Sequence, residues 1–128
     1  MQINKLDHVN IRTQNLDTMI AWYSEVLGLK RGKRPNFPFN GAWMFLGDQP
    51  VVHLVEFKMD GLVGAEVNLK LEHFAFSAQG LSEFEAKLDR LKIRFDRVDI
   101  AEFNFAQINI WDPDGNHIHV DFRLDETV

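Results

Sequence analysis

An internal repeat constrains this sequence more than any other feature. The segment LDHVNIRTQNLDTMIA, residues 6–21, aligns without gaps on LEHFAFSAQGLSEFEA, residues 71–86, at an offset of 65 residues. A second match, between GDQPVVHLVEF at residues 47–57 and PDGNHIHVDFR at residues 113–123, has an offset of 66 residues. Because a match of this length indicates that one structural unit occurs twice, the chain is predicted to be an internal duplication.

Hydrophobic periodicity predicts the same order of elements in each half: strand, helix, strand, strand, strand. Asn15 is a predicted N-cap and Gly28 a predicted helix stop, and Ser82 and Glu85 are predicted to form a capping box. The predicted strands are residues 3–12, 29–34, 43–46 and 51–57, then 70–77, 93–98, 103–111 and 117–122. The fold class is therefore α+β, one domain with modules at residues 1–58 and 69–128 and a linker at 59–68.

Four of the five histidines fall on repeat-equivalent positions, His8 with His73 and His53 with His119. A single histidine could be a core or rim residue whose ring nitrogens are bonded locally. Two strands per repeat that place imidazoles at the same register would instead bring four nitrogen ligands together, which suits a divalent transition metal. We therefore predict a metal site at these four histidines, with zinc, nickel or iron(II) as the ion.

His117 and Asp121 share the predicted strand face of His119, because side chains two residues apart point to the same side of a strand. Either residue could support a metal ligand or act as a general base, so both are candidate catalytic residues. The alternative for Asp121 is a solvated carboxylate at a strand end, and His117 has the same ambiguity.

Candidate substrate-binding residues surround this predicted site. Arg12 could bind a carboxylate or phosphate or could form an ion pair at the rim. Two phenylalanines in a proline-rich loop could form a lid over a ligand, a plug at a barrel end or a dimer contact. Residues of the inner hairpins are also expected to line the cavity. The full set is Asn10, Arg12, Phe37, Phe39, Trp43 and Asn109.

Composition excludes several classes of partner. The net charge is -5 and the longest basic cluster is short, which argues against nucleic acid and favours a small-molecule ligand. The absence of cysteine excludes disulfides and thiolate chemistry. Because no apolar run approaches the length of a membrane span and the first residues do not resemble a secretory signal, we expect no membrane partner and a cytoplasmic location.

Two motifs resemble the vicinal oxygen chelate superfamily, which includes glyoxalase I, bleomycin-resistance proteins, fosfomycin-resistance enzymes and extradiol dioxygenases. LDHVNIRTQNLDTMIAWYSEVLGL is similar to its opening module and DPDGNHIHVDF to its closing motif, so the resemblance covers nearly the whole chain. It implies paired βαβββ modules whose curled sheets form a cup. In metal-dependent members the ligands come from the first and last strands of each module, which implies His8, His53, His73 and His119.

The last ligand position differs from that of most of those enzymes, because this chain has His119 where they carry a carboxylate. The implied site is therefore all imidazole and lacks the ligand carboxylate that glyoxalase-type proton transfer would use as a base. Two functions follow. One is a metal-dependent enzyme of lyase, isomerase or dioxygenase type that acts on a small oxygenated molecule. The other is a metal-free small-molecule or drug-binding protein. Either is expected to form a homodimer, because modules of this superfamily pair within one chain or between two.

Overall fold

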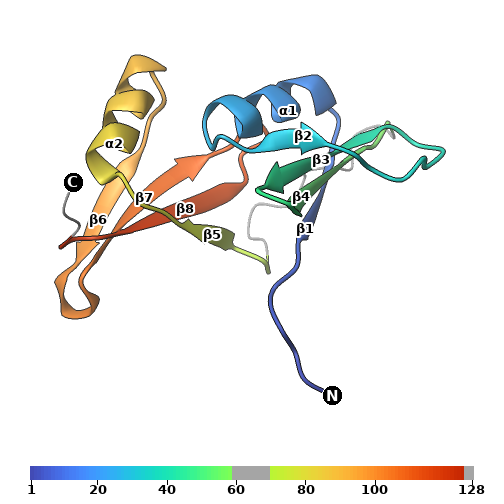
Figure 1. Ribbon diagram of the computed structural model, residues 1–128. Helices are drawn as coiled ribbons and strands as arrows, with labels where there is room; N and C mark the ends of the chain where they lie inside the picture. The colour runs from blue at the N-terminus through green and yellow to red at the C-terminus, as the bar shows by residue number, and fades with distance from the viewer. Residues whose placement is uncertain (59–69, 126–128) are drawn as a thin grey trace. The chain divides into compact units, whose positions relative to one another are not determined.

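The computed structural model describes residues 1–58 and 70–125 (Figure 1). The chain divides into two compact units, Met1–Ala65 and Glu66–Val128. The boundary falls in the predicted linker at residues 59–68, which lies outside the described residues.

Each unit has the predicted order of strand, helix, strand, strand, strand. The described part of the first unit contains β1 (Val9–Thr13), α1 (Leu16–Glu25), β2 (Lys30–Gly32), β3 (Gly41–Leu46) and β4 (Gln49–Glu56). The described part of the second contains β5 (His73–Ser77), α2 (Leu81–Arg90), β6 (Asp96–Ile100), the 3-10 helix η1 (Ala101–Phe103), β7 (Phe105–Trp111) and β8 (His117–Arg123). The α+β class and the two βαβββ modules are confirmed.

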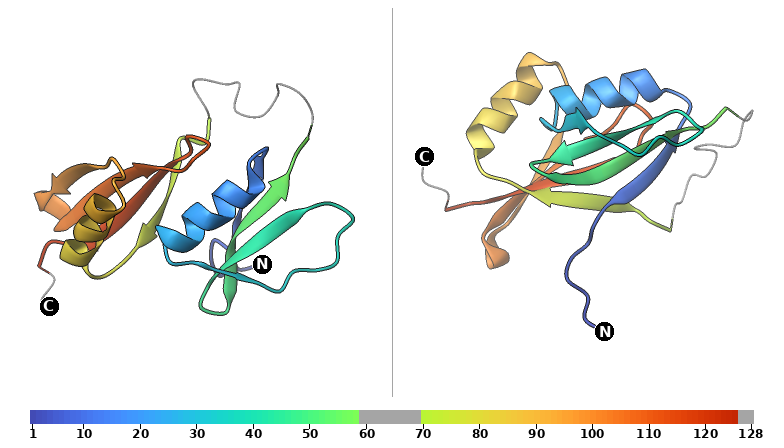
Figure 2. Two further views of the ribbon diagram at one scale, coloured as in Figure 1. Left: turned by 90° about the horizontal axis from the view of Figure 1, so that it is seen from above. Right: turned by 45° about the vertical axis from the view of Figure 1, so that its right-hand side comes forward.

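The two sheets share one topology. The strand order is β1-β4-β3-β2 in the first unit and β5-β8-β7-β6 in the second. In each unit the first and last strands are parallel neighbours, and the remaining pairs are antiparallel (Figure 2). The register places Asn10 beside His53 and Ala75 beside His119. Because the first and last strands adjoin, the histidines that the sequence places on them meet within each unit.

The helices cover the apolar face of their own sheets to different extents. Met19 and Tyr23 of α1 are fully buried, and the helix packs on β3 and β4, where Met44 and Leu54 are also fully buried. In α2 only Leu88 is buried among the described residues, although Phe84 lies 5.6 Å from Phe122 between ring centroids. Since strand side chains alternate, residues next to this apolar core point to the other face, which carries the histidines.

The helix ends follow one prediction and correct another. Asn15 is the N-cap of α1, and Gly28 follows its end with φ +72°. The predicted capping box at Ser82 is wrong, because the N-cap of α2 is Gly80, whose φ of +91° suits glycine, and Ser82 already lies inside the helix. Neither helix of the described chain is long and apolar enough to cross a membrane.

The first strand is shorter than predicted, since β1 begins at Val9 rather than near residue 3. The next positions of β4 in this parallel register include Pro50, which has no N–H to donate to a neighbouring strand. Side chains tie the preceding segment instead: Lys5 donates to Gln49 Oε1 at 2.9 Å, and Gln49 Nε2 donates to the Asp7 carbonyl at 2.6 Å. His8 therefore lies immediately before the sheet begins.

Candidate functional site

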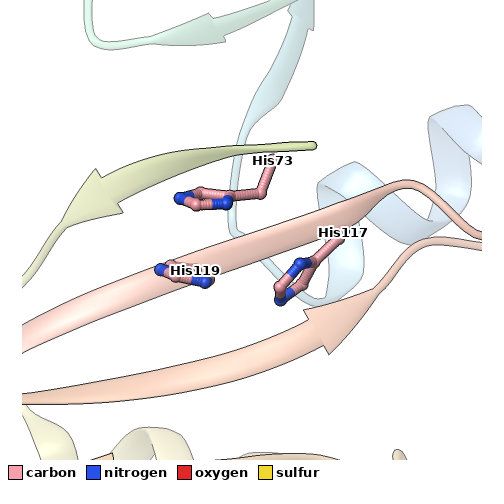
Figure 3. A group of neighbouring side chains, drawn as sticks. All are labelled: His73, His117 and His119. Atoms are coloured by element: carbon pink, nitrogen blue, oxygen red, sulfur yellow. The ribbon is translucent and has the colours of Figure 1, made fainter. Parts of the chain in front are cut away.

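Three imidazoles of the second unit gather on one face of its sheet: His73 from β5, with His117 and His119 from β8 (Figure 3). The rings of His73 and His119 are stacked with centroids 3.9 Å apart, and the centroids of His117 and His119 are 4.8 Å apart. One nitrogen from each ring lies within 4.8 Å of the others. The cluster follows from the parallel β5–β8 register, which pairs His73 with His117 and leaves His119 on the same side of β8.

His119 has the properties of a metal ligand. It is 7% exposed, and neither of its ring nitrogens has a hydrogen-bond partner among the described residues. Burial lowers the pKa of His119, and the neighbouring His73 and His117 lower it further. A lowered pKa keeps the ring neutral, which is the form that binds a metal ion.

His117 differs from the other histidines because both of its ring nitrogens are engaged. Nδ1 lies 3.0 Å from the Glu72 carboxylate and Nε2 lies 2.9 Å from Asn109 Oδ1, and the ring donates both hydrogen bonds only when both nitrogens carry a hydrogen. The ring of Trp111 stacks on the imidazole at 5.1 Å. A ligand role for His117 therefore requires that one of its hydrogen bonds breaks.

Asn109 supports His117 rather than presenting a free amide. Its Nδ2 donates to the carbonyl of Asp96 at 3.1 Å, which leaves Oδ1 to accept from His117. Asn109 is 9% exposed, and its hydrogen bond to the Asp96 backbone fixes the orientation of this buried amide. The predicted contact of Asn109 with substrate stays a prediction.

Asp121 lies on the same face of β8 as His117 and His119, two residues beyond His119. Its Oδ1 is buried and has no hydrogen-bond partner within the described chain. Burial raises the pKa of Asp121, although the nearby His119 and His73 oppose this rise. One oxygen of this carboxylate is therefore shielded from solvent, and the choice between a catalytic Asp121 and a solvated strand-end carboxylate stays a prediction.

The first unit brings its two histidines together in a different setting. The rings of His8 and His53 are stacked 3.8 Å apart, and Trp43 stacks on His53 at 4.1 Å. His53 Nε2 donates to the Pro50 carbonyl at 3.0 Å, and His8 Nδ1 donates to Asp7 Oδ1 at 2.8 Å. Burial lowers the pKa of His53, and the neighbouring His8 adds to this effect. Each ring keeps one nitrogen without a hydrogen bond to the described residues.

The remaining predicted site residues lie in the first unit. Asn10 and Arg12 are exposed residues of β1, and the Arg12 guanidinium lies 5.8 Å from the Phe57 ring centroid. Arg12 makes no ion pair with a carboxylate of residues 1–58 or 70–125, so the rim ion pair considered for it is not formed there. In the loop before β3, Phe37 and Phe39 stack at 5.1 Å, and Arg34 lies 5.2 Å from each ring. The lid function stays a prediction.

Sequence reasoning missed the two carboxylates that bond the first-strand histidines. Glu72 accepts from His73 Nδ1 at 2.5 Å, as Asp7 accepts from His8. The repeat carries the signal, because an acidic residue precedes the first histidine in both copies. His8 with His53 and His73 with His119 are brought together within their own units. That all four bind one ion stays a prediction, since it joins residues of both units.

Comparisons with known proteins cover nearly the whole chain. The family model described as Glyoxalase/Bleomycin resistance protein/Dioxygenase superfamily matches residues 5–120. The Arabidopsis thaliana protein "Glyoxylase I 4" is 27% identical over 125 residues, which are 94% of this chain and 71% of that protein. A glyoxylase/bleomycin resistance protein/dioxygenase domain from Frankia sp. EAN1pec has a TM-score of 0.75 and 18% identity, with 95% of this chain and 99% of that one covered. The trypanothione-dependent glyoxalase I of Leishmania major has a TM-score of 0.67 and 21% identity, with 92% and 86% covered.

Proposed function

The chain belongs to the glyoxalase/bleomycin resistance protein/dioxygenase superfamily, and we propose that it is a metal-dependent enzyme of that superfamily. The proposed substrate is a small oxygenated molecule that offers two adjacent oxygens to a divalent ion. The proposed reaction is of lyase, isomerase or dioxygenase type. The observation that carries the proposal is the pair of proposed ligands His73 and His119, whose stacked rings lie 3.9 Å apart in a cluster with His117 in which one nitrogen of each ring is within 4.8 Å of the others.

The donor set fits zinc, nickel or iron(II), because imidazole nitrogen is a common ligand of all three. His8, His53, His73 and His119 each keep a ring nitrogen that makes no hydrogen bond to the described residues, whereas both nitrogens of His117 are engaged. This division supports the four ligands expected from the repeat. We therefore propose these four as ligands and give His117 a supporting role.

Asp121 is the group of the second unit best suited to accept a proton from a substrate. Its Oδ1 is buried and unpaired among the described residues, and burial raises its pKa, which makes the carboxylate a stronger base. The carboxylate shares the strand face of His119, so a molecule beside that ring lies within reach of it. A divalent ion bound there would supply the Lewis acidity that polarises a substrate carbonyl.

A metal-free binding protein is the second candidate function. The observation that favours it is the stack of His8, His53 and Trp43, a continuous set of aromatic faces of the kind that receives planar ligands. Asn10 and Arg12 on the adjoining strand could bind polar groups of such a ligand. The exposed Phe37 and Phe39 could then cover it as an apolar lid.

Metal titration distinguishes the two functions. Protein stripped of metal would be titrated calorimetrically with zinc, nickel and iron(II), the last without oxygen. The enzyme proposal expects saturable binding of one ion per proposed site. Failure of all three ions to bind would reject the metal-dependent function, and binding of planar aromatic compounds by the same sample would then support the second candidate.

We also propose that the protein acts as a homodimer, the assembly expected for modules that can pair between chains. Light scattering at micromolar concentration would be expected to give twice the 14.9 kDa mass of one chain. A single species at the mass of one chain would contradict the dimer without affecting the proposed chemistry. The small-molecule partner and the cytoplasmic location remain parts of this proposal.

A further inference from the structure

Glu72 lies between two imidazoles of the second unit. Its carboxylate accepts a hydrogen bond from His73 Nδ1 at 2.5 Å and another from His117 Nδ1 at 3.0 Å. We propose that Glu72 is a positioning residue that keeps the proton of His73 on Nδ1 and thereby presents Nε2 as the ligand atom. This inference rests on the metal-binding function proposed above, and it assigns a role to a residue outside the ligand set.

The chemistry of a carboxylate explains the selection of one tautomer. An ionised carboxylate has only lone pairs, so a ring nitrogen that bonds to it must carry a hydrogen. Glu72 is 67% exposed, and a carboxylate in contact with solvent is ionised at neutral pH. In a neutral ring the other nitrogen, Nε2 of His73, then holds the lone pair. A carboxylate in this position also makes the imidazole a more basic ligand.

A chain of hydrogen bonds connects Glu72 to the interior of the unit. Glu72 itself is 67% exposed, and an isolated ion pair at such a position would hold a ring only weakly. Here His117 holds the carboxylate from a second side, and the buried Asn109 holds His117. Asn109 in turn donates to the Asp96 carbonyl. His117 Nδ1 lies within 3.2 Å of both oxygens of the Glu72 carboxylate, so this chain of contacts restricts the direction in which Glu72 points.

The first unit provides an internal comparison. Asp7 occupies the position equivalent to Glu72 and accepts from His8 Nδ1 at 2.8 Å. However, Val51 stands where the second unit has His117, and Trp43 stands where it has Asn109. Among the described residues of the first unit, Asp7 therefore has no second imidazole hydrogen-bonded to it. We infer that Glu72 favours the Nδ1–H tautomer of His73 more strongly than Asp7 favours the same tautomer of His8.

The Glu72 carboxylate also supplies negative charge that an all-imidazole metal site lacks. Neutral imidazoles leave the charge of a divalent ion uncompensated, whereas Glu72 places one negative charge directly behind a ligand ring. Removal of Glu72 should therefore weaken metal binding without removing a ligand. Replacement by aspartate, the residue of the first copy, should preserve both the charge and the tautomer.

The test compares Glu72→Ala and Glu72→Asp with Glu102→Ala, a control that removes an exposed carboxylate at the opposite end of the β7–β8 hairpin. Long-range ¹⁵N NMR of the metal-free proteins reports which nitrogen of His73 carries the proton. Competition with a chelator reports zinc affinity. We expect Glu72→Ala to shift His73 towards the Nε2–H form and to lower zinc affinity about 10- to 100-fold. Glu72→Asp and the control should retain the wild-type values.

Two results would overturn the inference: an unchanged His73 tautomer in Glu72→Ala, or a zinc affinity equal to that of the control variant. Failure of the wild-type protein to take zinc, nickel or iron(II) would instead reject the proposed metal function. The NMR comparison uses metal-free protein, so it would still accept or reject the positioning role in that case. The two failures are therefore distinguishable.

Discussion

The two units have the same strand order but carry different chemistry on equivalent faces. The first unit has an aromatic stack in which His53 lies between His8 and Trp43. The second replaces that tryptophan by Asn109 and joins its imidazoles through hydrogen bonds.

The strand that carries the last histidine shows the same divergence. Val51 and Val55 flank His53, whereas His117 and Asp121 flank His119. Duplication thus preserved the backbone that pairs the histidines, while the residues around them became apolar in one unit and polar in the other. Under the proposed function, proton transfer would therefore belong to the second unit and aromatic contact with a ligand to the first.

Removal of a ligand should have the largest effect. His119→Ala is expected to lower zinc affinity more than about 100-fold, beyond the loss typical of a residue that only supports a ligand. His53→Ala, the equivalent change in the first unit, should cause a loss of similar size if four histidines bind one ion. Chelator competition on both variants measures this. A zinc affinity of His53→Ala equal to that of the wild-type protein would restrict the site to the second unit.

Exchange of Trp43 for the residue of the second unit should destabilise the protein. Trp43→Asn removes the stack on His53 and exposes apolar surface, at an expected cost of about 1–3 kcal/mol in the free energy of unfolding. Urea denaturation followed by far-UV circular dichroism measures the change. Asn109→Ala is the matched variant in the other unit, and an equal cost for both would argue against an energetic difference between the two settings.

Metal binding should depend on pH in a way that distinguishes His119 from a carboxylate. An imidazole must lose its proton to bind metal, so affinity falls with acidification, by about tenfold per pH unit for each proton displaced. The pKa values of His53 and His119 are lowered from the ordinary histidine value near 6.5. Protons therefore compete with the metal ion for these two rings only at a more acidic pH.

More than one proton should be released per metal ion bound at acidic pH. His119→Glu should lessen this dependence, since a carboxylate takes up its proton at a lower pH. Calorimetric titration of both proteins in buffers of different ionisation enthalpy counts the released protons. Identical counts would mean that His119 is not a ligand and would leave His8, His53 and His73.

The smallest expected change concerns the stability of the unbound protein. Asp121→Val, which installs the residue that Val55 provides in the first unit, should raise the free energy of unfolding by about 1 kcal/mol at neutral pH, because a buried unpaired oxygen is removed. The folded-state pKa of Asp121 is raised, so the penalty is present above that pKa and disappears as the pH falls and the carboxyl protonates. Denaturation at neutral and acidic pH measures this gain, and a pH-independent gain would contradict the explanation.

Much of the fold was predictable because it depends on local patterns that occur twice. The helix of the first unit begins and ends near the predicted Asn15 and Gly28, since the side chain periodicity and the turn residues are local signals. The second helix was misread at Ser82 because the glycine before it accepts a backbone conformation that the capping rule does not consider.

The candidate site was predictable only in part. The repeat identified His8 with His53 and His73 with His119, and the structure brings each pair within stacking distance. It did not identify the contacts that His117 makes with Glu72, 45 positions earlier in the chain, and with Asn109, 8 positions earlier.

The sequence alone therefore determined the duplication, the order of elements and the histidines that share a face, because offsets and alternation are properties of the chain. Tertiary structure decided which ring nitrogens are engaged and which stay available. That choice depends on the cross-strand register of β5, β7 and β8, where Glu72 and Asn109 meet His117 from either side. Hydrogen-bond direction is a property of the assembled sheet, since a donor is committed only once its acceptor lies beside it.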